Sequence, residues 1–309
     1  MSKLSVLAIF QLCFCVLTAS AQEFKPGLPG MAPMRWITIK NTRAPGRVYQ
    51  SLNGNARTYT VEDTYIKAWI PLVLKSRFAL AIGPHYRTEQ LDLKRVPDHV
   101  DDQMASWKLR AFGVDIKSCF ALDSTTWLMN TANISQSGNV NVNSQSNIPI
   151  TYTISSTFMK RKSNNKEMGF GLMINKSRSL LVLPVIVYNY NFSAKQGLEI
   201  SLPHKIAWRH NLSPTDIIYV KAEANIRTYF IRNGTNSNFE QFRRIDADMG
   251  ITYNKQITRF MGAELFAGYR QNFSYHLPED IIALKNSGFV ASFEIYIRPP
   301  QGLINRKRP

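Results

Sequence analysis

The stretch from Phe260 to Phe273, FMGAELFAGYRQNF, alternates apolar and polar side chains along nearly its whole length. Successive side chains of an extended chain point to opposite faces, so this stretch predicts a β-strand with one apolar and one polar face. Only Phe266 interrupts the polar face. The fold of the chain therefore depends on whether such apolar faces pack on a protein core or meet lipid.

Similar runs recur through the chain, separated by turn-forming residues rather than by amphipathic helices. Short connections such as 75–76 and 254–257 predict an antiparallel meander in which neighbours in sequence pair. Pro71, Pro184 and Pro203 fall inside runs, and because proline cannot donate to a ladder, we expect bulges or strand ends there. The expected strands are 34–41, 64–74, 77–87, 106–116, 124–134, 149–159, 167–174, 180–192, 198–209, 218–231, 243–253, 260–273 and 287–297.

Strand length and aromatic placement favour a membrane barrel over a soluble β-sandwich, which would also alternate. Many runs reach about 11 residues, the length that a tilted strand needs to cross a bilayer. Aromatic side chains lie near several strand ends, as in the interfacial girdles of membrane barrels. Lipid supplies no hydrogen bonds, so a sheet in it must close on itself. The sequence predicts an all-β fold, a closed antiparallel up-and-down transmembrane β-barrel of about 12 strands, within a range of about 10–14.

The N-terminus has the features of a secretory signal peptide. Lys3 precedes the mostly apolar run Leu4–Leu17, and Ala19-Ser20-Ala21 fits a small-residue cleavage site. Cleavage near Ala21 would leave Cys119 as the one cysteine, so we expect no internal disulfide. No later segment is apolar for long enough to form a spanning helix. The expected organisation is a signal peptide at 1–21, a lead-in with a possible first strand at 22–60, the barrel at 61–298 and a basic tail at 299–309.

In a barrel the polar strand faces would line the lumen. Two interpretations of these faces stay open, a salt-bridge network that fills a narrow interior and a polar permeation path or binding cavity. The net charge of +17 must come from elsewhere, and basic clusters in turns or in the tail suit anionic lipid head groups. The expected lumen-lining residues are Lys221, Glu223, Arg227, Arg244, Asp246, Asp248, Glu264, Arg270 and Glu294.

Several segments together resemble the outer-membrane β-barrel proteins of unknown function found in Bacteroidota-type bacteria. These segments are ASAQ at the signal end, WIPLVLKSRFALAIGPHY, GFGLMIN with LLVLPVIVY, LEISLPHKIAWRHNLS and the closing strand GFVASFEIYI. The resemblance implies a bacterial outer-membrane location, contact with outer-membrane lipid and lipopolysaccharide, and insertion by the barrel-assembly machinery. The residues that follow Arg298 depart from the pattern of ending on an aromatic residue. The family implies no established activity.

The search for chemistry gives no metal-binding, phosphate-binding or CxxC motif, so we expect no cofactor, no metal and no nucleic-acid partner. The main hypothesis is a non-enzymatic outer-membrane protein, a small-solute pore or an envelope scaffold. One alternative is a lipid-modifying barrel enzyme that uses His85 and His276 on its rim. A second alternative is a soluble β-sandwich that binds carbohydrate through Trp36, Trp127 or Trp208.

Overall fold

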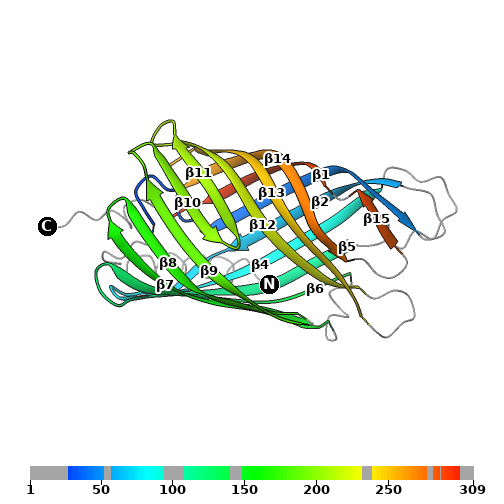
Figure 1. Ribbon diagram of the computed structural model, residues 1–309, viewed down its shortest axis with the longest axis horizontal. Coiled ribbons are helices and arrows are strands. Elements are labelled where there is room, and N and C mark those ends of the chain that lie inside the picture. Colours follow the sequence, from blue (N-terminus) through cyan, green and yellow to red (C-terminus); the bar gives the residue numbers. More distant parts are fainter. Residues whose placement is uncertain are drawn as a thin grey trace, which may run out of the picture.

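The strands pair into one closed antiparallel barrel (Figure 1). The computed structural model describes residues 27–51, 57–93, 108–139, 148–177, 179–231, 239–276, 281–285 and 287–299. Among these residues, none forms a helix of the length and apolarity that a membrane crossing needs. The strands are β1 Ile37–Ser51, β2 Arg57–Ala68, β3 Ile70–Leu74, β4 Phe78–Leu93, β5 Lys108–Ala121, β6 Thr126–Gly138, β7 Ile150–Ser163, β8 Lys166–Lys176, β9 Leu180–Asn191, β10 Gln196–Leu202, β11 Lys205–Asn211, β12 Asp216–Ile231, β13 Glu240–Gln256, β14 Met261–His276, β15 Ile281–Lys285 and β16 Gly288–Ile297.

The ring closes at β1, which pairs with β2 on one side and with β16 on the other. Ile39 lies opposite Ile66 in one ladder and opposite Ile295 in the other. β2 and β3 together form one span against β4, and β15 and β16 form one span against β1, so the barrel has 14 strands. The predicted fold class is confirmed, and the strand number lies within the expected range.

Two hairpins account for the difference from the strands expected from the sequence. The run 198–209, expected as one strand, is the hairpin of β10 and β11 with its turn at Pro203 and His204. The segment 37–68 holds the long pair β1 and β2, where the expected strands 34–41 and 64–74 left residues 42–63 unassigned. Charged side chains on both faces of this segment, such as Arg43 and Asp63, hide its alternation. β1 begins at Ile37, within the segment 22–60 that was expected to hold a lead-in and a possible first strand.

The three prolines that fall in the expected strands have different effects on strand pairing. Pro203 ends β10, as expected. Pro71 lies at an irregularity in the pairing of β3 with β4, also as expected. Pro184, in contrast, lies opposite Leu172 in an unbroken register, so the expected bulge or strand end is absent there. Pro184 is tolerated because β9 has an unpaired edge at this level, where no donor is needed.

The two ends of the barrel differ in their connections. Turns such as 122–125, 192–195 and 212–215 lie at the end where β1 begins and β16 finishes, and we call it the short-turn end. It is on the left in Figure 1. The longer connections 94–107 and 232–239 join strands at the opposite end, the long-loop end. Short turns on one side and long loops on the other are typical of outer-membrane barrels.

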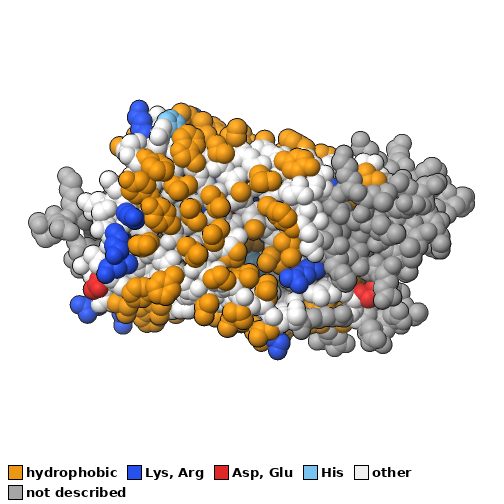
Figure 2. Space-filling view, in the orientation of Figure 1, with side chains coloured by type: hydrophobic (Ala, Val, Ile, Leu, Met, Phe, Trp, Pro, Cys, Tyr) orange, Lys and Arg blue, Asp and Glu red, His pale blue; other side chains and the backbone are white. Residues whose placement is uncertain are grey.

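The outer surface is a broad apolar belt, which Figure 2 shows on one face of the barrel. Side chains such as Phe170, Leu172, Val182 and Ile251 are each more than half exposed. A water-soluble protein rarely exposes a continuous apolar surface of this extent. Trp127, a candidate carbohydrate contact in the sandwich hypothesis, is 1% exposed and lies inside. The β-sandwich alternative is therefore wrong, because the sheet closes on itself and its apolar faces point outward.

Candidate functional site: the barrel lumen

The structure places all nine expected lumen residues on the inner face, where each contacts another charged side chain. They separate into two groups along the barrel. Arg227, Arg244, Asp246, Asp248 and Arg270 lie toward the long-loop end, whereas Lys221, Glu223, Glu264 and Glu294 lie toward the short-turn end.

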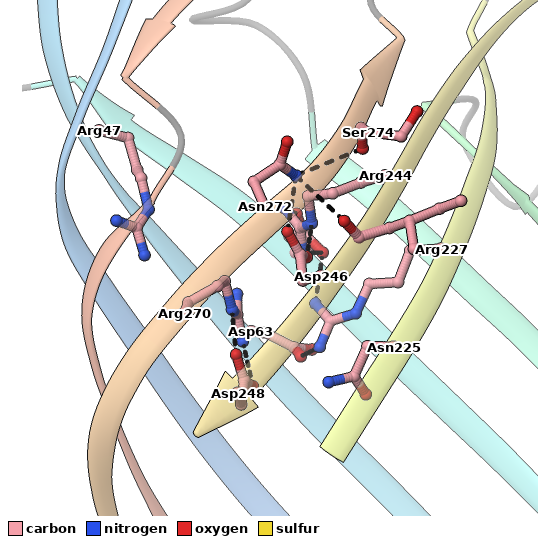
Figure 3. Close-up of polar contacts among 12 residues, drawn as sticks. Arg47, Asp63, Asn225, Arg227, Arg244, Asp246, Asp248, Arg270, Asn272 and Ser274 are labelled. Atoms are coloured by element: carbon pink, nitrogen blue, oxygen red, sulfur yellow. Dashed lines mark hydrogen bonds and ion pairs between the residues drawn. The ribbon is translucent and has the colours of Figure 1, made fainter. Parts of the chain in front are cut away.

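Three members of the first group, Arg227, Arg244 and Asp246, form with Asp63 and Glu89 what we call the Glu89 cluster. Figure 3 labels Asp63, Arg227, Arg244 and Asp246 of this cluster. Glu89 accepts from Arg227 Nη1 at 2.8 Å and from Arg244 Nη1 at 2.7 Å. Arg227 Nη2 lies 2.7 Å from Asp63 Oδ2, and Arg244 Nε lies 2.6 Å from Asp246 Oδ2. All five side chains are buried. Charges buried together in this way are held in place by one another, because water cannot replace a lost partner.

Two neighbouring contacts extend this cluster. Arg270 forms a bidentate pair with Asp248, with distances of 2.6 Å and 2.8 Å from Nε and Nη2 to the carboxylate oxygens. Asn272 donates to Asp246 Oδ1 at 2.8 Å. The inner face of the strands from β12 to β14 is therefore filled by paired charges, as the salt-bridge interpretation of the sequence anticipates.

The second group centres on Glu264. Lys221 Nζ lies 3.1 Å from Glu264 Oε1 and 3.3 Å from Glu223 Oε1. Arg35, which precedes β1, pairs with both Glu264 and Glu294. Burial by itself would lower the pKa of the Arg35 guanidinium, but these two carboxylates raise it, so Arg35 remains charged.

Arg35 belongs to a segment that crosses the short-turn end of the lumen, which we call the strap, residues Gly27–Trp36. Arg161 Nη2 donates to the Gly27 carbonyl at 3.0 Å, and the Gly27 N–H donates to Glu167 Oε1 at 3.1 Å. Further along, the Ala32 N–H donates to the Tyr219 hydroxyl at 3.1 Å. The strap thus runs from the side of β7 and β8 past β12 to β14 and β16, and it lies across this mouth of the barrel.

Gly30 fits the middle of the strap for two reasons. Its φ of +81° lies in the left-handed region that favours glycine. A Cβ at this position would lie 2.3 Å from Arg209 Nη1 and 2.6 Å from Asn211 Nδ2. Arg209 and Asn191 also reach the carbonyl of Pro29, with Asn191 Nδ2 donating at 3.0 Å. The strap backbone is therefore fitted closely to the inner wall.

The middle of the inner face of β6 to β9, on the long-loop side of the Arg161–Glu167 pair, carries no charged side chain among the described residues, and we call it the neutral wall. Along β9, side chains alternate between exposed and half-buried, with Leu181, Leu183 and Val185 turned inward. Thr131 and Ser155 hydroxyls bond to each other at 2.6 Å on the same inner face. Half-buried side chains inside a barrel border unfilled space. The neutral wall is formed by Met129, Thr131, Ser155, Gly171, Met173, Leu181, Leu183 and Val185.

Both ends of the lumen narrow. At the long-loop end, Phe230 of β12 pairs with Gly138 of β6, and Ser137 Oγ donates to the Thr228 carbonyl at 2.5 Å. A Cβ on Gly138 would lie 2.3 Å from the Phe230 oxygen, so glycine permits this contact. Beside it, an apolar cluster fills the interior with Ala44, Tyr59, Val61, Leu109, Tyr229, Ile231, Phe242, Phe266 and Val290. At the short-turn end, Cys119, Trp127, Met159 and Val187 pack together near the strap.

His85 does not lie at the lipid-facing rim that the enzyme hypothesis requires. His85 points into the lumen, where its Nδ1 lies 3.2 Å from Asp115 Oδ2, and Lys67 Nζ lies 2.5 Å from the same oxygen. The side chain of His276 lies outside the described residues. Within the described part of the chain, no group of three or more His, Cys, Asp or Glu residues could hold a metal ion.

Sequence reasoning missed Asp63, Glu89, Arg161 and Arg209, although two of them carry a readable signal. Asp63 alternates with the buried Tyr59 and Val61, in a segment that was not recognised as a strand. Glu89 continues the inward spacing of β4 beyond residue 87, where the strand was expected to end. Arg161 belongs to the basic run Lys160–Lys162, one of the clusters expected in turns, but it bonds to Glu167 inside the barrel.

A family model with the description "Domain of unknown function (DUF6268)" matches residues 124–282. A comparison with curated proteins finds no match to this sequence. The matched segment runs from the turn before β6 into β15, so it contains the neutral wall, the β10–β11 hairpin and most of the two charge clusters.

Solved outer-membrane structures are similar in fold. The COG4313 outer membrane channel from Pseudomonas putida F1 is 10% identical, with 89% of this chain and 100% of that chain covered and a TM-score of 0.46. The P. putida toluene transporter TodX is 6% identical, with 87% and 91% covered and a TM-score of 0.44. LpxR from Salmonella typhimurium is 9% identical, with 85% and 100% covered and a TM-score of 0.37. At these scores the likenesses carry no argument about activity.

Proposed function

This chain belongs to the family described as Domain of unknown function (DUF6268), and we propose that it is an integral outer-membrane protein that conducts small solutes through its lumen without chemistry of its own. The observation that supports this proposal is the neutral wall. Many charged side chains elsewhere in the lumen are held in ion pairs, whereas Thr131, Ser155 and Leu183 are uncharged and keep accessible surface inside a closed barrel. Lys117, which lies opposite Thr131, is an exposed charged side chain next to this surface. Space bordered by uncharged side chains is suited to the passage of small solutes.

In this proposal the short-turn end faces the periplasm and the long-loop end faces the outside of a bacterial cell, as in other barrels. The signal peptide directs export, and the barrel-assembly machinery inserts the chain. Outer-membrane lipid and lipopolysaccharide are the surrounding partners, with the excess of basic residues outside the lumen near their anionic groups. The Bacteroidota-type origin implied by the sequence resemblance is part of the same proposal.

In this proposal the position of the strap decides whether solutes can pass through the short-turn mouth. It lies across the short-turn mouth and is held by Arg35 at one end and by the Arg161–Glu167 pair at the other. Solutes that use this mouth pass only when the strap moves. The protein should therefore behave as a mostly closed channel whose opening depends on these ion pairs.

Conductance of the purified protein in planar bilayers tests the proposal. Wild-type protein should give rare openings, and Arg35→Ala should raise the open fraction severalfold because two anchoring ion pairs are lost. Arg43→Ala is the matched control, since its pair with Glu62 lies on the exposed side of the barrel and does not touch the strap. Correct folding is checked by heat-modifiable migration on gels. If folded Arg35→Ala is as silent as a protein-free bilayer, the channel proposal fails and an envelope scaffold takes its place.

The lipid-modifying alternative has less support. That hypothesis needs a serine and a histidine at the lipid-facing rim. His85 instead lies on the inner face, bonded to Asp115. Lipid profiles of cells with and without the protein should be the same, and a reproducible loss of acyl chains in cells that carry it would revive the enzyme hypothesis.

A further inference from the structure

The hydrogen-bonded wall of the barrel has a gap between β9 and β12. β10 and β11 are short, so β10 pairs with β9 only from Ile186 onward, and β11 pairs with β12 only as far as Glu223. No described strand pairs with Leu180–Val185 of β9 on the side that faces β12. The gap appears in Figure 1 beyond the tip of the β10–β11 hairpin.

The gap is bounded on all sides, and we call it the side window. On the hairpin side, the Ala224 N–H donates to the His204 carbonyl at 2.8 Å. On the long-loop side, Gln241 Nε2 donates to Ser177 Oγ at 3.3 Å, so the β8–β9 turn reaches the start of β13. Between these limits the free edge of β9 is about 20 Å long, at about 3.3 Å per residue.

The side chains at the window are apolar on both faces of β9. Val182, Pro184 and Ile186 point outward, while Leu181, Leu183 and Val185 point inward and form part of the neutral wall. On the opposite edge, Ile226 of β12 is 41% exposed. An inward face in a polar lumen would normally carry polar side chains. Here apolar surface continues from the membrane side of the barrel to its interior.

The backbone at the window also indicates that lipid alone does not seal it. Unpaired backbone donors are strongly disfavoured in hydrocarbon, so a membrane barrel leaves strand edges open only where they border a water-accessible space or a bound molecule. Pro184 lies on this edge and lacks an N–H, which removes one unpaired donor. The edge is thus arranged to stay open without an attached strand.

We propose that the side window is a lateral exit through which small, uncharged, apolar solutes pass between the neutral wall and the membrane. This inference rests on the proposed conducting function and names its solute class. Ionic solutes are disfavoured because the β9 edge carries apolar side chains, which cannot replace a hydration shell, and because Arg227 on the inner side of the β12 edge is already paired with Asp63 and Glu89. The hydroxyls of Thr131 and Ser155 inside the barrel would accommodate a single polar group on the solute.

Uptake of the uncharged fluorescent probe N-phenyl-1-naphthylamine by intact bacterial cells tests this inference. Cells that carry the wild-type barrel should take up the probe severalfold faster than cells that lack it. Leu183→Trp should remove most of this increase, because the bulky side chain fills the window from inside. Val182→Trp is the matched control on the adjacent, lipid-facing position and should keep wild-type uptake. Leu183→Asn is a second variant without added bulk, and its polar side chain should also slow uptake.

The outcomes separate this inference from the proposed function. Surface amount and heat-modifiable migration establish that each variant is folded. Equal uptake by folded Leu183→Trp and Val182→Trp, or no increase with wild-type protein, overturns the side window. If Arg35→Ala still conducts ions in bilayers, the channel proposal survives that result. If Arg35→Ala is silent as well, both proposals fail.

Discussion

Arg227 of β12 and Glu89 of β4 form an ion pair across the lumen, with 2.8 Å between Nη1 and Oε2, although 138 residues separate them in the sequence. Glu89 also accepts from the Tyr229 hydroxyl at 3.1 Å, and it is 1% exposed. The barrel interior at this level is therefore held together by side chains that lie far apart in the sequence.

Glu89→Gln should destabilise the barrel strongly. The substitution leaves Arg227 and Arg244 buried with too little negative charge, and breaking a buried pair in this way costs about 3–5 kcal/mol. Urea unfolding of the detergent-solubilised barrel, followed by heat-modifiable migration, measures the change. Glu62→Gln is the control, because its pair with Arg43 is partly exposed and should be worth at most about 1 kcal/mol. Equal losses for both variants would contradict a stabilising role for the Glu89 cluster.

Gly30→Ala should loosen the strap, whereas Gly46→Ala should not. Both glycines have a left-handed φ, so both variants lose about 1–2 kcal/mol from backbone strain. Only at Gly30 does the new Cβ collide with the Arg209 guanidinium, since nothing lies within 4 Å of a Cβ at Gly46. Trypsin cleavage after Arg35 should therefore become faster in Gly30→Ala alone. Unchanged cleavage in Gly30→Ala would show that the strap does not depend on this fit.

Leu172→Arg and Met173→Arg should differ although the positions are adjacent in β8. Leu172 is 59% exposed on the lipid-facing side, and an arginine there costs about 2–4 kcal/mol near the middle of a bilayer. Met173 faces the lumen, where the guanidinium can reach water. The yield of folded barrel in the membrane fraction should fall for Leu172→Arg and remain closer to wild type for Met173→Arg. The opposite order would reverse the assignment of the two faces.

Cysteine labelling should separate lipid-facing from lumen-facing positions. In a Cys119→Ala background, cysteines at Ala247 and Ala267 should react with a lipid-soluble maleimide and poorly with a charged one. A cysteine at Thr131 should show the reverse preference, because that position lies on the neutral wall. Labelling of Ala267→Cys by the charged reagent in intact membranes would mean that this face meets water.

The sequence alone was sufficient to place strands in which apolar and polar side chains alternate clearly. It was insufficient to give the bounds of strands in which that alternation is masked by charge or interrupted by a turn. The inward positions Lys221, Arg227 and Glu264 follow from their spacing in clean strands. The strands β1 and β2 were expected too short because Arg43 and Glu62 place charge on the outward face. The run 198–209 was expected as one strand because apolar side chains at alternate positions, such as Leu198 and Ile206, recur on both sides of Pro203. Glu89 was missed because the expected strand ended two residues too early.

By itself, the sequence determined that this chain forms a membrane barrel and which strand faces meet lipid, because a period of two residues is a local property of the extended backbone. Only the tertiary structure decided which charges meet across the lumen, where the strap lies and where the wall stays open. Those features depend on how the ring closes, which brings β4 opposite β12, and on the relative lengths of strands far apart in the chain, such as β9 and β12. Residue spacing within one strand carries no information about ring closure or about the lengths of other strands.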